Sequence, residues 1–119
     1  MPDAAVRLDL EDRHLLLVRA ILSAHVPGAE VVAFGSRVSG TAKPYSDLDL
    51  AIRSDSRIDL RTLAALEDCF QESDLPFRVD VLDWHQISDA FKSIVSRSAV
   101  VVQAVSADRV DETLLPTGP

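Results

Sequence analysis

The sequence predicts one α+β domain, in which a mixed β-sheet carries helices packed mainly on one face. Its 119 residues, 47% of them apolar, suffice for a single core of modest size. Helical and strand patterns follow one another in the order helix, strand, loop, strand, helix, strand, helix, strand. The loop between the first two strands is too short for a parallel crossover with a full helix, which takes at least about 10–12 residues. A mixed sheet therefore fits this order better than a doubly wound parallel one.

The first half of the chain supplies one helix and two strands. Residues 8–25 place apolar side chains at helical spacing, and Pro27-Gly28 ends that pattern. Residues 31–34 are apolar throughout, as expected of a strand that is buried on both faces. After the loop, residues 47–53 begin with a strict alternation of polar and apolar side chains, which predicts a second strand.

The second half adds two helices and two strands. A helix is expected over residues 59–73, and its first residue, an aspartate, is suited to cap it. Residues 77–82 alternate and form the third strand. Asp83 is then placed to cap an amphipathic helix over residues 83–96. Residues 99–105 are apolar and β-branched and predict a last strand.

Composition limits the classes of function. We expect a domain over residues 1–105 and a polar, disordered C-terminal tail over residues 106–119. The net charge of −7 argues against broad nucleic-acid binding, because that binding needs Lys and Arg to neutralise phosphates. No apolar run approaches the roughly 20 residues of a membrane span. With one cysteine and no signal peptide, the chain is expected to be cytoplasmic and to lack an internal disulfide.

The most informative stretch runs from Gly35 to Leu50 and reads GSRVSGTAKPYSDLDL. Asp47 and Asp49 alternate with apolar residues, so their carboxylates share one face of a strand. Two carboxylates on one face repel each other, which disfavours ionising both. A divalent cation turns that repulsion into coordination. Mg²⁺ suits such a site, because it is commonly held by one or two carboxylates together with substrate phosphates.

The start of the same stretch is suited to phosphate binding. Gly35 allows a close backbone approach, and Ser36 can donate a hydrogen bond. If residues 37–41 begin a helical turn, their free N–H groups add an anion site. Arg37 and Lys43 supply positive charge. Each feature alone is common in solvated turns, but their joint order favours binding of a metal-bound nucleoside triphosphate.

This stretch resembles the nucleotidyltransferase superfamily whose best-known member is DNA polymerase beta, and above all its minimal, MNT-type members. Their motif is Gly-Ser, a short spacer containing a glycine, and then Ser-Asp-x-Asp-Leu. Here the motif appears as Gly35-Ser36, Gly40 and residues 46–50. The resemblance extends over residues 31–102 and implies the nucleotidyltransferase fold.

The family also carries a third acidic residue on a later strand, and Asp80 matches it. By strand parity Asp80 shares the face of the first two acids, whereas Asp83 falls on the opposite face. Arg78 shares the face of Asp80, where it can either pair with that carboxylate or approach a phosphate.

The resemblance implies transfer of a nucleoside monophosphate, with AMP expected, from an NTP such as ATP to an acceptor hydroxyl, with pyrophosphate as the leaving group. It implies that Asp47, Asp49 and Asp80 are the catalytic acids and hold two metal ions, Mg²⁺ or else Mn²⁺. The residues that it implies for nucleotide binding are Gly35, Ser36, Arg37 and Ser46. It also implies a helical HEPN-type partner protein that offers the hydroxyl, with the chain acting as its antitoxin.

Two other functions stay open. The same fold can serve as a non-catalytic antitoxin or binding subunit, and metal-dependent NTP binding would separate that function from the enzyme. A small-molecule transferase, such as one acting on an aminoglycoside, is expected less, because those proteins usually carry an extra helical domain.

Overall fold

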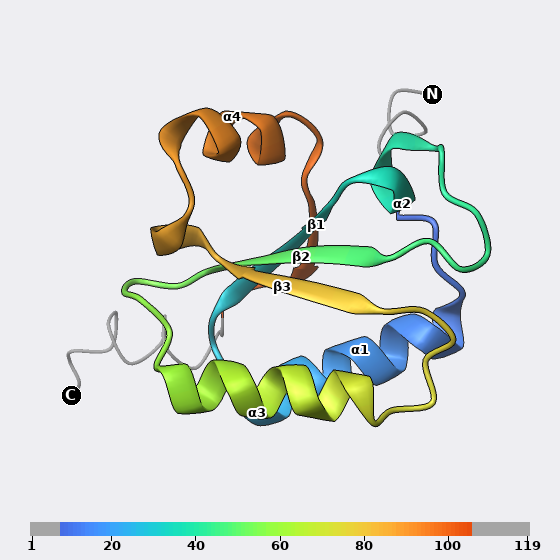
Figure 1. The fold of residues 1–119 in the computed structure, drawn as a ribbon, viewed down its shortest axis with the longest axis horizontal. Helices are drawn as coiled ribbons and strands as arrows, with labels where there is room; N and C mark the ends of the chain where they lie inside the picture. The colour runs from blue at the N-terminus through green and yellow to red at the C-terminus, as the bar shows by residue number, and fades with distance from the viewer. Residues whose placement is uncertain (1–7, 106–119) are drawn as a thin grey trace, which may run out of the picture.

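The computed structural model describes residues 8–105, and Figure 1 shows a central sheet with helices on both of its faces. The predicted disordered tail, residues 106–119, lies outside the described residues. The elements in chain order are α1 Asp12–His25, β1 Glu30–Phe34, α2 Ser36–Ser39, β2 Leu48–Arg53, α3 Leu60–Gln71, β3 Val79–Asp83, the 3₁₀ helix η2 Trp84–Gln86, α4 Asp89–Ser98 and β4 Val100–Gln103.

The sheet is mixed, as predicted. Its strand order is β3-β2-β1-β4, with β1 antiparallel to both β2 and β4, and with β2 parallel to β3. The parallel pair is joined through α3, which provides the long crossover that parallel strands require. Strands β1 and β2 are joined only by α2 and a loop. This short connection suffices because antiparallel neighbours need no crossover.

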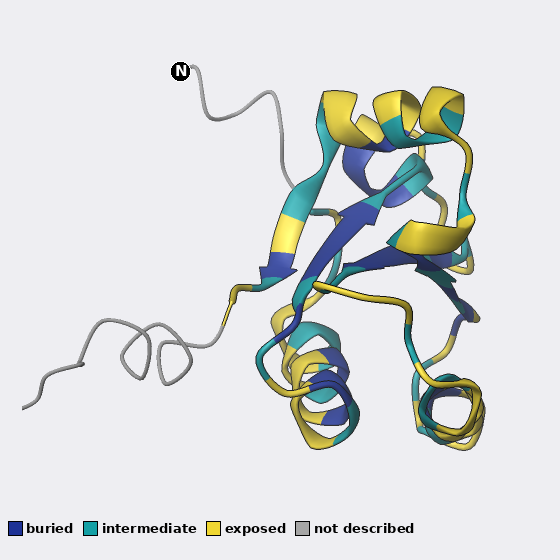
Figure 2. Cartoon of the chain, turned by 90° about the vertical axis from the view of Figure 1, so that its left-hand side faces the viewer, coloured by how far each residue is buried: buried dark blue, intermediate teal, exposed yellow. Residues whose placement is uncertain are grey.

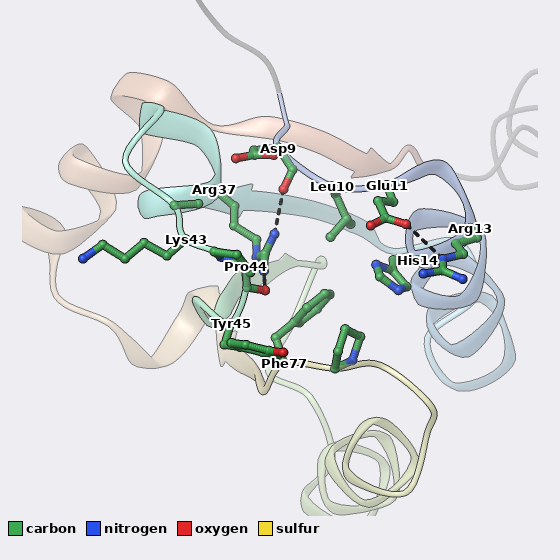
Figure 3. Close-up of a pocket in the computed structure, with 12 residues that line it drawn as sticks. Asp9, Leu10, Glu11, Arg13, His14, Arg37, Lys43, Pro44, Tyr45 and Phe77 are labelled. Carbon is green, nitrogen blue, oxygen red and sulfur yellow. Dashed lines mark hydrogen bonds and ion pairs between the residues drawn. The ribbon is translucent and has the colours of Figure 1, made fainter.

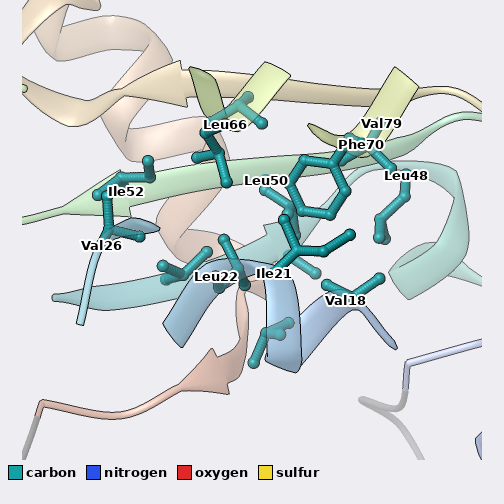
Figure 4. Packing of buried hydrophobic residues seen from close by; sticks show 14 of the residues in the cluster. Val18, Ile21, Leu22, Val26, Leu48, Leu50, Ile52, Leu66, Phe70 and Val79 are labelled. Atoms are coloured by element: carbon teal, nitrogen blue, oxygen red, sulfur yellow. The ribbon is translucent and has the colours of Figure 1, made fainter. Parts of the chain in front are cut away.

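The main core lies between the sheet and the helices α1 and α3. Figure 4 shows its tightly packed aliphatic side chains, which include the fully buried Val18, Leu22, Leu50, Ile52 and Leu66. The two longest helices therefore cover one face, as the sequence predicts. In Figure 2 the strands are largely buried between the helical layers, and the outward faces of the helices are exposed.

Helix α4 covers part of the opposite face of the sheet. A smaller cluster forms there from Val32, Ala51 and Val95, with Phe34 and Phe91 packed edge to face at 5.8 Å between ring centroids. The middle of β1 is buried on both faces, which explains the uniformly apolar sequence of residues 31–34.

The prediction of one continuous helix over residues 83–96 is wrong, because the structure has two separate helices there. Asp83 does act as a cap, but it caps η2, where its Oδ1 accepts a hydrogen bond from the amide of His85 at 3.0 Å. The chain then becomes extended at Ile87, and Ser88 caps α4 through a 3.1 Å bond from the amide of Phe91. A second capping residue five positions later thus starts a new helix.

The topology places three positions side by side at one end of the sheet. Phe34, the last residue of β1, pairs with Asp49 of β2, and Asp49 pairs with Asp80 of β3. Gly35 follows Phe34 directly. The glycine turn and two of the predicted acids therefore lie across three neighbouring strands.

Within the described residues, no helix is both long and apolar enough to cross a membrane.

Candidate active site

The three predicted acids gather on one face at this end of the sheet. Asp49 lies between Leu48 and Leu50, which are fully buried in the main core, so its side chain points to the opposite face. The same alternation holds for Asp80, whose two valine neighbours are buried in the same core. Asp47 directly precedes β2, and its parity matches that of Asp49. The structure therefore brings these three carboxylates together as expected.

Arg78 links two of the acids. One terminal guanidinium nitrogen of Arg78 lies 3.2 Å from Asp47 Oδ2, and the Nε of Arg78 lies 3.5 Å from Asp80 Oδ1. The ion-pairing role that the sequence left open for Arg78 is thus present, and it extends to a second carboxylate. One guanidinium nevertheless faces three carboxylates, so the cluster keeps an excess of negative charge.

The pKa of Asp49 is raised at this site. Burial raises the pKa of the Asp49 carboxyl above its ordinary value of 3.8, and the charges of Asp80 and Asp47 raise it further. Arg78 acts in the opposite direction and lowers the pKa. The ionised form of Asp49 is therefore disfavoured first by burial and then by the neighbouring carboxylates.

Gly35 lies against Asp49. Its φ of +84° belongs to the left-handed region, which residues other than glycine rarely adopt. A Cβ at this position would overlap Asp49 Oδ2 and would lie 3.4 Å from Asp49 Cγ. The absence of a side chain at Gly35 thus lets the Asp49 carboxylate lie directly against the backbone of the turn.

The remaining motif residues shape the loop between β1 and β2. Ser36 begins α2 immediately after Gly35, so its hydroxyl group belongs to the same end of the sheet. Gly40 ends α2 in the left-handed conformation, with a φ of +89°. Ser46 closes a turn, because its Oγ accepts a 2.8 Å hydrogen bond from the amide of Lys43 and its own amide donates to the Lys43 carbonyl at 3.0 Å. That turn leads directly into Asp47.

Arg37 is placed differently from its predicted role in nucleotide binding. Its side chain is buried and donates hydrogen bonds of 2.9 to 3.0 Å to the carbonyl oxygens of Asp9, Pro44 and Ser46. Its guanidinium also stacks on the Phe77 ring, 4.3 Å from the centroid. Figure 3 shows Arg37 reaching from α2 toward Asp9 and Pro44. The structure therefore makes Arg37 an anchor of the loop, with its guanidinium engaged by carbonyl oxygens and the Phe77 ring.

The sequence pattern does not reveal this anchoring role. An arginine two residues after a Gly-Ser turn suggests a phosphate ligand, and nothing in the local pattern indicates that its partners are carbonyl groups. The stacking partner, Phe77, is distant in sequence, and its own pattern indicates only a strand.

Two hollows lie near this end of the molecule. The first, of about 440 Å³, is lined by residues that include Arg37, Lys43 and Tyr45, but by none of the three acids (Figure 3). The second, of about 550 Å³, lies between α3 and β3 and is lined by residues that include Arg78 and Asp80. The groove between α3 and β3 is thus the one of these two that reaches the acid cluster.

The acids fit a divalent cation that is completed by a ligand. Their donor atoms are carboxylate oxygens, which Mg²⁺ prefers, and the repulsion among the three carboxylates is one of the causes of the raised pKa of Asp49. Among the described residues, no three His, Cys, Asp or Glu side chains form a ready-made metal cage. A Mg²⁺ ion held by only one or two carboxylates takes its other ligands from water and substrate phosphates.

Comparison with known proteins identifies the family. A family model described as the nucleotidyltransferase domain matches residues 16–109, which is most of the chain. The chain belongs to this nucleotidyltransferase family. Nucleotidyltransferases of this kind generally use an NTP and a divalent metal ion, which agrees with the chemistry of the acid cluster.

The nucleotidyltransferase also has a curated relative and several similar solved structures. It is 48% identical over 97 residues to the probable protein adenylyltransferase MntA of Haemophilus influenzae, covering 82% of this chain and 85% of that protein. A crystal structure of a toxin–antitoxin complex with AMP-PNP contains a similar chain, with a TM-score of 0.64 and 22% identity, covering 87% of this chain and 80% of the other.

A second structure contains a tri-AMPylated HEPN toxin from Shewanella oneidensis in complex with an MNT antitoxin. Its matching chain gives a TM-score of 0.62 and 19% identity, covering 87% of this chain and 79% of the other. At these identities the two structures establish a shared fold, whereas the family model and the curated relative establish the family.

Proposed function

We propose that this nucleotidyltransferase moves AMP from ATP to a hydroxyl group on a HEPN-type partner protein and thereby acts as its antitoxin. The observation that carries the proposal is the row of Gly35, Asp49 and Asp80 across three strands, with Asp47 beside it. The choice of AMP and of a protein acceptor is supported by the 48% identical relative, which is named a protein adenylyltransferase. The choice of partner is supported by the similar chain in complex with an AMPylated HEPN toxin.

In this proposal Asp47, Asp49 and Asp80 hold two Mg²⁺ ions, with Mn²⁺ as the alternative metal. When bound, such ions neutralise phosphate charge and stabilise the attacking and leaving oxygens. The chain's own acids supply oxygen ligands from two strands whose backbones are held in register. They are therefore positioned before the substrate arrives, which lowers the reorganisation needed during the reaction.

The triphosphate is proposed to lie on the side of Gly35. Gly35 carries no side chain that would keep a phosphate away from the backbone, and the hydroxyls of Ser36 and Ser46 are the proposed hydrogen-bond donors to the phosphate. Arg37 contributes indirectly, because its bonds to the carbonyls of Pro44 and Ser46 hold the loop in place.

The acceptor is proposed to enter from the side of Asp80, along the groove between α3 and β3. The acceptor oxygen attacks the α-phosphorus, the bond from that phosphorus to the pyrophosphate oxygen breaks, and pyrophosphate leaves. Asp80 is the residue proposed to receive the proton of the hydroxyl. Because ATP and the partner are intracellular in this scheme, the cytoplasm is the compartment that the proposal requires.

Transfer to the partner tests the proposal. The protein is mixed with its HEPN-type partner, ATP and Mg²⁺, and intact-mass spectrometry follows both chains. We expect the partner to gain the mass of one or more AMP units, and Asp47→Asn with Asp49→Asn to abolish the gain. The control changes two exposed acids outside the cluster, Asp68→Asn in α3 with Asp74→Asn in the loop that follows it, and should retain transfer. Binding of the partner without any AMP transfer would instead favour a non-catalytic antitoxin.

A further inference from the structure

Arg78 occupies a position that a metal ion would also need. Its guanidinium contacts Asp47 Oδ2 and Asp80 Oδ1, which belong to two of the three proposed metal ligands. A cation that binds these same two oxygens competes with the guanidinium of Arg78 for them. The positive charges of the cation and the guanidinium also repel each other at this short range.

We propose that Arg78 is a positioning residue that serves as the counter-ion of the acid cluster in the metal-free protein and leaves it when a metal ion binds with the nucleotide. This inference rests on the proposed function, because it takes the three acids as the metal ligands. It adds a difference between two ligands. A metal ion alone has to displace Arg78, whereas the metal–nucleotide complex also brings phosphates that can pair with the released guanidinium.

The surroundings of Arg78 allow this movement. Its side chain is 74% exposed, so it can swing away without opening the core. Its main chain is fixed, because the amide of Leu48 donates a 2.9 Å hydrogen bond to the Arg78 carbonyl. The strand pairing that holds Asp80 beside Asp49 thus persists when the side chain moves.

The charges favour an exchange over permanent pairing. A guanidinium carries one positive charge, and its two ion pairs are partly exposed, so each is weak in water. A divalent cation carries twice that charge and is bound directly by the carboxylate oxygens. Competition by Arg78 should therefore weaken the binding of free metal ions without preventing it. By thermodynamic linkage, metal and nucleotide should each strengthen the binding of the other.

Binding of Mn²⁺, followed by the electron paramagnetic resonance of the free ion, tests this inference without any measurement of activity. Titrations are made with and without AMP-PNP on the wild type and on Arg78→Gln. The control is Arg57→Gln, which removes an equal charge from an exposed position beyond the far end of β2. Arg78→Lys keeps the charge but loses the forked geometry.

Without nucleotide, Arg78→Gln should bind Mn²⁺ about three- to tenfold more tightly than Arg57→Gln, the range expected when two weak ion pairs no longer compete. Arg78→Lys should lie close to the wild type. The strengthening of Mn²⁺ binding by AMP-PNP should be smaller in Arg78→Gln. Equal or weaker binding by Arg78→Gln would overturn the inference while leaving the proposed function intact. Failure of the wild type to bind Mn²⁺ even with AMP-PNP would overturn both.

Discussion

At the level of single residues, the contact between Gly35 and Asp49 connects the phosphate turn to the acids. Two separate properties make glycine necessary there: its positive φ and the space that a Cβ would fill. Gly40 shares the first property, with a φ of +89°, but a Cβ added to Gly40 would meet nothing within 4 Å. The two glycines thus allow backbone strain to be separated from the clash with Asp49.

We predict that Gly35→Ala lowers AMP transfer by about 100-fold, because displacing Asp49 disturbs the alignment of the reacting groups. Gly40→Ala should retain most of the transfer. Both should lower the free energy of unfolding by about 1 kcal/mol or more through the strained φ. Urea denaturation and the transfer assay together check this, and equal loss of activity in the two variants would contradict the role given to Gly35.

The raised pKa of Asp49 predicts a pH-dependent effect on stability. Because the pKa is higher in the folded state than its ordinary 3.8, protonation of Asp49 stabilises the fold. That contribution is fully present below pH 3.8 and is lost as pH rises through the raised pKa. In EDTA at neutral pH, Asp49→Asn should therefore melt at a higher temperature than the wild type.

The melting curves should approach each other as the pH falls toward 3.8. A stability gain that persisted unchanged at acid pH would show that the substitution acts through packing and not through charge. Addition of Mg²⁺ with ATP at neutral pH should stabilise the wild type but not Asp49→Asn, since the carboxylate of Asp49 is a strong metal ligand and the amide that replaces it is not.

At the level of elements, the loop from α2 to β2 depends on Arg37. Removing its guanidinium leaves the carbonyls of Asp9, Pro44 and Ser46 without that donor and removes the stacking on Phe77. We predict that Arg37→Met lowers the free energy of unfolding by roughly 2–4 kcal/mol, measured by urea denaturation. Lysine should restore little, because a single ammonium group lacks the planar fork of donors.

Arg19 provides the matched control for that measurement. It is an exposed residue that donates one 3.0 Å hydrogen bond to the carbonyl of Val102. Arg19→Met should therefore cost about 1 kcal/mol. An equal loss in the two variants would mean that the several contacts of Arg37 add nothing to the stability of the loop.

Helices and strands could be predicted from the sequence where the pattern of neighbouring residues decides their structure. The alternation around Asp49 and Asp80 correctly places both on one face, because strand parity is a property of neighbouring residues. The helix over residues 83–96 was wrong in its continuity, because two capping residues, Asp83 and Ser88, compete within one short segment. Asp83 also accepts a 2.8 Å bond from the amide of Ile58, a partner too distant for a local pattern to reveal.

At the level of the whole molecule, the antiparallel β1–β2 pair and the parallel β2–β3 pair together create the site. The short loop between β1 and β2 allowed a mixed sheet to be predicted, but the strand order β3-β2-β1-β4 and the position of α4 were not predictable, because they depend on packing between distant segments. The placement of the three candidate acids on one face was predictable, since they come from short motifs. Arg37 was the exception, because its function depends on tertiary contacts.

Binding of a metal-bound nucleoside triphosphate by the three acids underlies every step proposed for this protein, and thermal denaturation with ATP and Mg²⁺ is its sharpest test. At about 100 times its dissociation constant, the ligand should stabilise the wild type by about 2.7 kcal/mol, with a clear rise in melting temperature. Asp47→Asn with Asp49→Asn should show no rise, whereas Asp68→Asn with Asp74→Asn should match the wild type. An unshifted wild type, or an equal shift in the Asp47 and Asp49 variant, would contradict metal–nucleotide binding at these acids.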